Sequence, residues 1–304
     1  MRSATSSARI RSRRSFRSAA ATSRRFLRLT TVSVQRTKAA AAAAALLYLA
    51  LPLHAADRQK IAALNVAGTT LVTWAGCLVH AKLTKTPPKH ARCLAAGAVG
   101  GAGYYQAKRL AGDGHITTAW LLANLTSSVV ENTTAGEHPL ARVGYSVGPL
   151  RLRIATPFDE KKESLLDIDV NAAEIGYLTR AIIDAADVDI RDGMIWYETE
   201  NAQVDEEGRT IHGYTWGLFP GVWTNAHPQV WSHEAVHAVQ ALQLDAVEPP
   251  ALILDRERRR VRVRHLRLGL FNVADNVGSQ LLPYEDRWFE IEAYRFAGDR
   301  EPPR

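Results

Sequence analysis

The chain has 304 residues, enough for one large domain or two modest ones, and its apolar content of 46% allows a sizeable core. The formal net charge is +7, but residues 1–56 hold eleven Arg and Lys and no acidic residue, so the remainder carries a net charge of −4. A mildly acidic folded part excludes nucleic acid as the main partner, because a phosphate-binding surface needs positive charge on the fold itself.

The first 56 residues have the composition of a targeting leader. Residues 1–38 are rich in Arg, Ser, Ala and Thr without apolar periodicity, and an uncharged apolar stretch follows over residues 39–55. A basic segment, a short apolar segment and small residues near Ala55 form the pattern of a signal peptide. The run at Ser23–Arg28 is similar to a twin-arginine signal, while the lack of acid equally suits a mitochondrial transit peptide. We expect a cell-envelope protein, exported or membrane-associated, with organelle import as the alternative.

Residues 57–135 form a second expected region, helical and rich in Ala and Gly. Residues 61–81 carry no charge and are long enough to span a bilayer, which takes about 20 residues. Two shorter stretches follow, Cys93–Gln106 with four glycines and Ile116–Val130. Glycine at such density suits close helix–helix contact. Two interpretations stand, a membrane-embedded region in contact with lipid and a soluble helical layer buried against the rest of the fold.

The chain has two cysteines, Cys77 and Cys93, and both lie in apolar stretches rich in Ala and Gly. Neither belongs to a CxxC pair, so a thiolate metal site is not expected. Small buried thiols are common in such surroundings. We therefore expect two buried free thiols rather than a disulfide.

The third expected region, residues 136–304, mixes strands and helices. Alternating apolar and polar residues predict strands, and apolar residues at helical spacing predict helices. The expected strands are Ser146–Ile154, Met194–Tyr197, part of His212–Trp223 and Val261–Leu270, and the expected helices are Leu165–Ala186, Pro228–Leu244 and Tyr284–Ala297, with a turn at Asp205–Gly208. This mixture predicts an α+β fold with a small mixed sheet after the helical region.

An arginine-rich run, Arg256–His265, carries the strongest local charge outside the leader. Its alternation with apolar residues indicates a strand with a solvated charged face. The other interpretation is contact with anionic lipid headgroups, which attract basic clusters next to a membrane.

The run WSHEAVHAVQ places Glu234 between two histidines, His233 and His237, in a segment without Gly or Pro over residues 229–247. Residues four apart on a helix lie on one face, so both imidazoles can bind the same metal ion. Glu234 can then take a proton from a metal-bound water, as a general base. Against a chance match on an ordinary amphipathic helix, this spacing favours a Zn²⁺ site with two histidine ligands and Glu234 as the catalytic residue.

A catalytic zinc site needs three protein ligands and one open position. The downstream candidates are Glu290 and Glu292, on the last expected helix. Side chains two positions apart on a helix point in different directions, so only one of these two glutamates can be the ligand. The other is expected to be a surface charge, and spacing alone leaves the choice open.

The HExxH motif with a downstream glutamate resembles the gluzincin metallopeptidases. The longer pattern, HExxHxxQ followed by ExEA[DY], is similar to a subgroup of small bacterial gluzincin domains, over about residues 185–300. The resemblance implies a zincin-like domain and selects Glu290 as the third metal ligand, with Glu292 as the alternative.

Three further residues enter through their place in this pattern. Gln240 lies one turn beyond the second histidine, where it can hydrogen-bond a site residue or stand at the core edge. Tyr214 lies on the aromatic, Gly-rich strand before the motif helix, and either Tyr214 or His212 is a candidate to stabilise an oxyanion. Tyr294 stands where related peptidases often have an aspartate that partners a ligand histidine. These are the expected supporting or transition-state groups.

Together these observations predict a zinc-dependent metallopeptidase. It would hydrolyse a peptide or protein substrate by metal-assisted attack of water, with Glu234 as base and then proton donor. The alternative is a non-catalytic, zinc-stabilised envelope or membrane scaffold protein. The enzyme is favoured because a purely structural site would not require Glu234.

Overall fold

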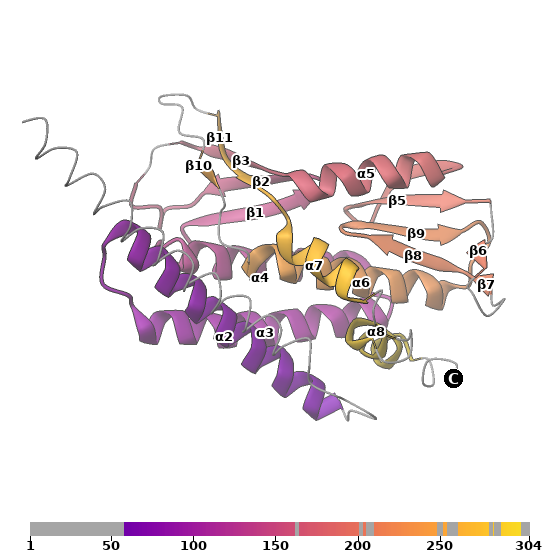
Figure 1. Cartoon of the computed structure of the whole chain (residues 1–304), viewed down its shortest axis with the longest axis horizontal. Helices are drawn as coiled ribbons and strands as arrows, with labels where there is room; N and C mark the ends of the chain where they lie inside the picture. The colour runs from indigo at the N-terminus through magenta and orange to yellow at the C-terminus, as the bar shows by residue number, and fades with distance from the viewer. Residues whose placement is uncertain are drawn as a thin grey trace, which may run out of the picture. The chain divides into compact units, whose positions relative to one another are not determined.

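The computed structural model describes residues 58–161, 164–200, 203–204, 210–247, 252–253, 261–279, 282 and 287–298. The leader, the expected turn at Asp205–Gly208, residues 256–260 of the arginine-rich run and the expected start of the last helix at Tyr284 lie outside these residues. Within them the chain forms seven helices and eleven strands, so the α+β fold expected from the sequence is confirmed (Figure 1).

Three helices form the N-terminal part: α2 (Arg58–Thr84), α3 (His90–Gly112) and α4 (Ile116–Thr134). They contain the three apolar stretches expected from the sequence, and each helix is longer than its stretch. Among the described helices, α2 has the length and composition to cross a membrane, and 33% of its apolar window is buried in the fold. The helical prediction for this region is confirmed.

Helices α2 and α3 pack closely because glycines of α3 face α2. A Cβ atom at Gly101 would lie 2.5 Å from the carbonyl oxygen of Asn65, so only glycine fits there. A disulfide joins Cys77 of α2 to Cys93 of α3. The expectation of two free thiols is therefore wrong, because the close approach of the helices brings the two Cα atoms to 6.4 Å, a distance that a disulfide spans.

A five-stranded sheet follows, with the order β1-β2-β3-β11-β10. Its strands are β1 (Arg142–Val147), β2 (Leu150–Ala155), β3 (Leu166–Asn171), β10 (Leu252–Ile253) and β11 (Val261–Arg267). The pairing is antiparallel except between β3 and β11, which run parallel. The single strand expected over 146–154 is instead a hairpin, because Gly148, with φ of 52°, turns the chain before Pro149.

This sheet carries its charges inside and many of its apolar residues outside. Val143, Leu150 and Ile154 are exposed, whereas the arginines and aspartates that alternate with the apolar side chains are buried. They form what we call the sheet network, a set of buried charged residues between the sheet and α4: Glu131, Arg142, Arg151, Arg153, Asp159, Asp167, Asp169 and Arg267. Within this network, Glu131 of α4 joins the helix to the sheet through its ion pairs with Arg151 and Arg267.

A four-stranded sheet has the order β4-β5-β9-β8. Its strands are β4 (Asp187–Arg191), β5 (Met194–Thr199), β9 (Phe219–Trp223) and β8 (Gly213–Trp216), while β6 (Gln203–Val204) and β7 (Thr210–Ile211) pair separately. Helix α5 (Ala172–Asp184) covers one face of this sheet (Figure 1). The helix expected over 165–186 is thus too long: its first residues are strand β3, and Asn171 caps α5 by accepting hydrogen bonds from two backbone amides.

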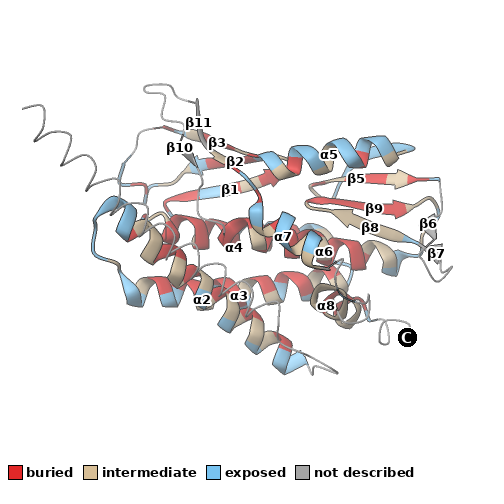
Figure 2. Ribbon diagram, in the orientation of Figure 1, coloured by how far each residue is buried: buried red, intermediate tan, exposed pale blue. Residues whose placement is uncertain are grey.

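The motif helix α6 (Pro228–Val247) lies between the four-stranded sheet and α3, and most of its length is buried (Figure 2). Helices α7 (Leu270–Ser279) and α8 (Trp288–Ala297) pack against α6. One hydrophobic core includes Ile61 of α2, Tyr104 of α3, Val236 of α6 and Phe296 of α8. The core therefore crosses residue 135, where the sequence suggested a boundary between the helical region and the metal-binding region.

Candidate metal centre

The structure brings His233, His237 and Glu290 together at the meeting of α6 and α8. The Nε2 atoms of the two histidines are 3.0 Å apart, and each lies 3.3 Å from Glu290 Oε2. All candidate ligand atoms of this group lie within 4.8 Å of one another. Three atoms at these separations are within reach of a single ion at the bond lengths of about 2.0–2.2 Å that zinc makes. Two imidazoles and one carboxylate are also a donor set that catalytic zinc uses.

The three side chains are reachable from solvent although the helices around them are packed. The His237 and Glu290 side chains are 15% and 16% exposed, whereas His233 is 9% exposed. A site with one buried and two partly exposed ligands can admit an ion and leave a position open to water or substrate.

Electrostatics within the triad favour a positive charge at its centre. Burial works to lower the pKa of His237, but Glu290 and the neighbouring acceptors outweigh it and raise this pKa to about 9. Burial likewise works to raise the pKa of Glu290, and the two histidines hold it well below its usual range instead. Without a metal, a proton on His237 therefore neutralises the carboxylate, and a cation can take the place of that proton.

Glu290 and Glu292 point to opposite sides of α8. Glu290 faces the histidines, whereas Glu292 is 0% exposed and pairs with Lys108 of α3 at 2.7 Å. The expectation that the second glutamate is a surface charge is wrong, because α8 packs with that side against α3 and α2. Gln240 of α6 accepts from His237 Nδ1 at 2.7 Å and donates to Glu292 at 2.8 Å.

Glu234 is buried beneath strand β8. Thr215 donates a hydrogen bond to Glu234 Oε2 at 2.8 Å, and a Cβ atom at Gly213 would lie 2.8 Å from Oε1. Burial raises the pKa of Glu234, while the charges of His233 and His237 act to lower it. A carboxylate in this setting is a stronger base than a solvated one, and glycine in β8 makes the room for it.

The two tyrosines suggested by the sequence have different places. Tyr294 lies one turn after Glu290 on α8, and its ring packs edge-on against His233 with centroids 4.6 Å apart. Tyr214 alternates with Gly213 and Thr215, so it faces away from α6. It packs against Tyr197 with ring centroids 5.5 Å apart.

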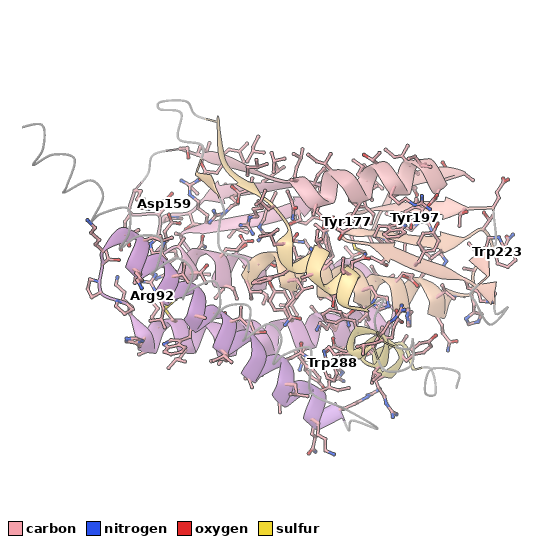
Figure 3. The ribbon with its side chains drawn as sticks, in the orientation of Figure 1. Arg92, Asp159, Tyr177, Tyr197, Trp223 and Trp288 are labelled. Atoms are coloured by element: carbon pink, nitrogen blue, oxygen red, sulfur yellow. A yellow bond between two sulfur atoms is a disulfide. The ribbon has the colours of Figure 1, made fainter. Side chains whose placement is uncertain are left out.

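The face that holds Tyr214 forms a second, smaller core beneath α5. Its members include Tyr177 of α5 and Tyr197 and Phe219 of the four-stranded sheet (Figure 3). His212 packs against Trp223 at the end of this sheet, with the two rings tilted and their centroids 5.7 Å apart. The structure therefore does not bring Tyr214 or His212 to the triad, because the period of two along a strand sends alternate side chains to opposite faces.

Asp275 of α7 interacts electrostatically with two residues of the triad, His237 and Glu290. Burial raises its pKa to about 7, His237 acts to lower that pKa and Glu290 acts to raise it. Nothing in the sequence marked this residue, since it belongs to no motif and α7 was not among the expected helices. The tertiary fold alone places it.

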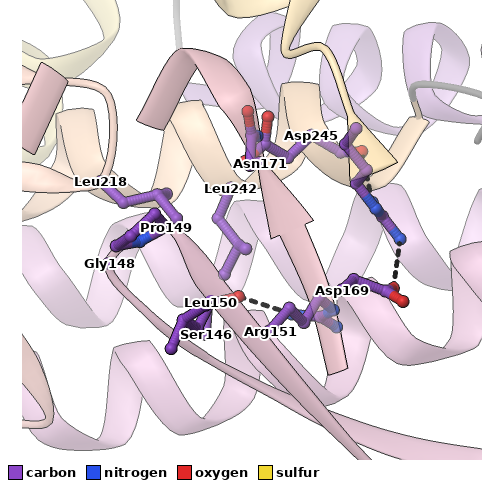
Figure 4. Close-up of a pocket in the computed structure, with 11 residues that line it drawn as sticks. Ser146, Gly148, Pro149, Leu150, Arg151, Asp169, Asn171, Leu218, Leu242 and Asp245 are labelled. Atoms are coloured by element: carbon purple, nitrogen blue, oxygen red, sulfur yellow. Dashed lines mark hydrogen bonds and ion pairs between the residues drawn. The ribbon is translucent and has the colours of Figure 1, made fainter. Parts of the chain in front are cut away.

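A pocket opens elsewhere, between the two sheets and α6 (Figure 4). Its lining includes Pro149, Asn171 and Asp245, and Arg267 donates to Asp169 in its wall at 3.3 Å. None of the candidate metal ligands lines it. The pocket and the triad are separate features.

No family model, no curated protein and no solved structure matches this chain. The chemistry of the triad therefore rests on its own geometry.

Sequence reasoning found the triad and, beside it, Gln240 and Tyr294, but it missed the residues of α2 and α3 that lie behind Gln240. Asn65 and Lys108 reach Glu292 from α2 and α3, at 2.6 and 2.7 Å. A single asparagine inside the uncharged stretch 61–81 is a polar residue that a buried helix has to satisfy, and this was the signal available. Thr215, one residue after Tyr214, could not be told from its neighbours without the phase of the strand.

Proposed function

We propose that this protein is a zinc-dependent metallopeptidase of gluzincin type, with His233, His237 and Glu290 as metal ligands. The observation that supports it is the convergence of two imidazole nitrogens and one carboxylate oxygen within 4.8 Å, beside a buried glutamate. A structural site would be expected to close with a fourth protein ligand. Among the described residues this cluster contains three ligands, which suits a catalytic site with an open position.

The proposed chemistry is hydrolysis of a peptide bond. A bound zinc ion supplies a Lewis acid that polarises a carbonyl and makes water acidic near neutral pH. Glu234 accepts the proton of the attacking water, and its raised pKa allows it to keep that proton until the leaving amine nitrogen takes it. Thr215 holds the carboxylate through its hydrogen bond to Oε2. Tyr294 limits rotation of the His233 ring by packing against it.

The first test is metal content. Purified full-length protein should hold about one zinc ion per chain, and His237→Ala should lose it. Metal analysis after zinc loading and desalting measures both. A wild-type protein that stays metal-free would refute the proposed function.

The second test separates an enzyme from a structural zinc module. Glu234→Gln removes the base and keeps the three ligands, so zinc content and melting temperature should stay near wild type. Hydrolysis of a peptide selected from a library should fall by about 100-fold or more, as expected for loss of a general base. Equal cleavage by both proteins would show that the activity does not belong to this site.

We also propose an exported or membrane-associated location. The disulfide between Cys77 and Cys93 suits an oxidising compartment, and α2 has the length and composition of a membrane span. Cell fractionation with carbonate extraction tests the membrane part. Recovery of the intact chain in the soluble fraction would leave α2 as a layer of the fold.

A further inference from the structure

A continuous line of buried polar side chains runs from the triad into the helical layer. His237 Nδ1 lies 2.7 Å from Gln240 Oε1, and Gln240 Nε2 donates to Glu292 Oε2 at 2.8 Å. Glu292 also accepts from Lys108 Nζ at 2.7 Å and from Asn65 Nδ2 at 2.6 Å. We call Gln240, Glu292, Lys108 and Asn65 the buried relay. Its members come from four helices and are at most 2% exposed.

The chemical groups of the buried relay fix which atom donates and which accepts in its hydrogen bonds. An ammonium donates and a carboxylate accepts, so Glu292 receives its bonds from Lys108 and from the amide nitrogen of Gln240. Gln240 Nε2 also donates to the carbonyl oxygen of Phe289 at 3.1 Å, which fixes the same orientation of the amide. The amide oxygen of Gln240 therefore faces His237, and Nδ1 of that histidine has to donate to it.

The orientation of Gln240 decides which nitrogen of His237 is offered to a metal. With Nδ1 as the donor to Gln240, the lone pair of Nε2 remains for coordination, and Nε2 is the atom that faces His233 and Glu290. Ligand histidines are commonly held by a hydrogen bond from the other ring nitrogen, and loss of that partner weakens metal binding. Here the partner is an amide, whose orientation depends on what lies behind it.

Lys108 reaches the relay because α2 and α3 are in close contact. At Gly101, two turns before Lys108 on α3, a side chain would clash with the Asn65 backbone. Asn65 then accepts from Lys108 Nζ at 2.8 Å and donates to the carbonyl oxygen of Ile61 as well as to Glu292. Burial lowers the pKa of Lys108, and the Glu292 carboxylate acts against this. The positive charge of Lys108 and the negative charge of Glu292 thus neutralise each other in the buried interior.

We propose that Lys108 is a positioning residue of the metal centre: through Glu292 and Gln240 it orients His237 with Nε2 toward the metal. The inference rests on the metal site of the proposed function. It makes the N-terminal helical layer a working part of that site, although no residue of the layer belongs to the triad.

The experiment compares two variants that each remove one buried cation from the full-length protein. Lys108→Met removes the cation of the buried relay, and Arg153→Met removes a cation of the sheet network that is 2% exposed. Zinc affinity is measured by competition with a chelator, and stability by chemical unfolding of the zinc-free proteins. Lys108→Met should lower zinc affinity by about 10–100-fold, the usual effect of losing a partner behind a ligand. Arg153→Met should lower stability and leave zinc affinity unchanged.

A spectroscopic measurement reports the orientation itself. In zinc-loaded wild type, a long-range ¹H–¹⁵N spectrum should show a proton on Nδ1 of His237. In Lys108→Met this signal should broaden or shift, because Lys108 no longer holds Glu292 and Gln240 keeps only the Phe289 carbonyl as a fixed acceptor. A merely structural lysine would change stability and leave this signal in place.

A double variant covers the case in which Lys108→Met does not fold. Lys108→Met with Glu292→Gln leaves no buried charge in the relay, and the amide introduced by the second substitution can either donate to Gln240 or accept from it. Zinc affinity should stay reduced in this protein. Wild-type affinity in the double variant, or equal losses in Lys108→Met and Arg153→Met, would overturn the proposal while zinc binding by the wild type keeps the metal site. A wild type without zinc would overturn both.

Discussion

Two clusters of charged and polar side chains, the sheet network and the triad, are built differently. In the sheet network, carboxylates face guanidinium groups: Arg142 lies 2.6 Å from Asp159 and 3.0 Å from Asp167. Glu131 accepts from Arg151 at 2.8 Å and lies 3.0 Å from Arg267. At the triad, by contrast, two imidazoles and a carboxylate turn their lone-pair atoms toward one point.

The difference shows that charged side chains can hold a fold together in one place and converge as possible metal ligands in another. A guanidinium has five donors and no lone pair to offer, so pairing with it uses up the acceptors of a carboxylate. Lone-pair atoms that converge within about 3 Å need a proton or a metal ion between them. Buried charge alone is therefore a poor sign of a functional site, and convergence of acceptors is a better one.

The largest effect is expected from breaking the sheet network. Arg151→Met leaves Glu131 without one of its cations, and removing one partner of a buried pair costs about 3–5 kcal/mol of unfolding free energy. Urea unfolding measures this, and zinc affinity should not change. The matched control is Lys161→Met, since Lys161 is 51% exposed beside Glu137 and should lose less than about 1 kcal/mol. Equal losses would show that the network is not stabilising.

Removing the disulfide should have the next largest effect, on the side of the molecule that carries Asn65 and Lys108. Cys77 and Cys93 are 16 residues apart in sequence, and closing such a loop contributes about 3 kcal/mol. Cys77→Ala with Cys93→Ala should lower the unfolding free energy by about that amount. Unfolding of the wild type with a reductant is the control, and an unchanged midpoint in both would contradict the pairing.

Substituting the two candidate glutamate ligands should have a smaller effect, and one confined to zinc affinity. Glu290→Gln removes a carboxylate of the triad and should lower zinc affinity by more than about 100-fold, or about 2.7 kcal/mol. Glu292→Gln acts only through Gln240 and should lower it by about 10–100-fold. Chelator competition ranks the two variants. The reverse ranking would make Glu292 the ligand.

The smallest expected effect is a difference between the sheet network and the triad in how their contributions to stability depend on pH, measured on zinc-free protein. Burial acts to raise the pKa of Glu131, but the surrounding arginines outweigh it and lower this pKa, so the contribution of Glu131 is present above about 4.5 and is lost as the pH falls below that value. The pKa of His237 is raised, so its contribution to stability is lost at high pH instead of low pH. Its contribution is complete below about 6.5 and is lost as the pH rises through about 9.

Thermal unfolding across this range should therefore show two separate losses of stability. Zinc loading should remove the alkaline loss, because the metal replaces the proton on the triad. The acid loss of the sheet network should remain. An alkaline loss that persists with zinc would place its origin elsewhere.

Local sequence signals predict the elements that carry the triad. Helix α6 follows from Pro228 and from an uninterrupted helical pattern, and the spacing of His233 and His237 on one face follows directly from it. Strand β3 differs from the helix expected at its place, although its alternation and the cap at Asn171 are visible in the sequence. The choice of Glu290 came from family resemblance, since phase alone did not select it.

The support that Asn65 and Lys108 give through Glu292 could not be predicted, because it depends on contacts between helices distant in sequence. Whether Lys108 points into the core or into solvent depends on how α3 packs, and nothing local decides that. The disulfide was missed for the same reason, since spacing in sequence does not give the distance between two helices. Tertiary contacts, rather than propensities, fix these features.

The hydrogen bond between Asn65 and Glu292 joins residues 227 positions apart. During synthesis, α2 and α3 leave the ribosome long before α8 exists. The early chain therefore contains Asn65 but not its partner Glu292. Contacts between such distant segments form late, because the entropy of closing a long loop opposes them. The His233–His237 pair can form as soon as α6 folds, but Glu290 arrives only with α8. Until α8 is made, the chain therefore holds two of the three candidate metal ligands.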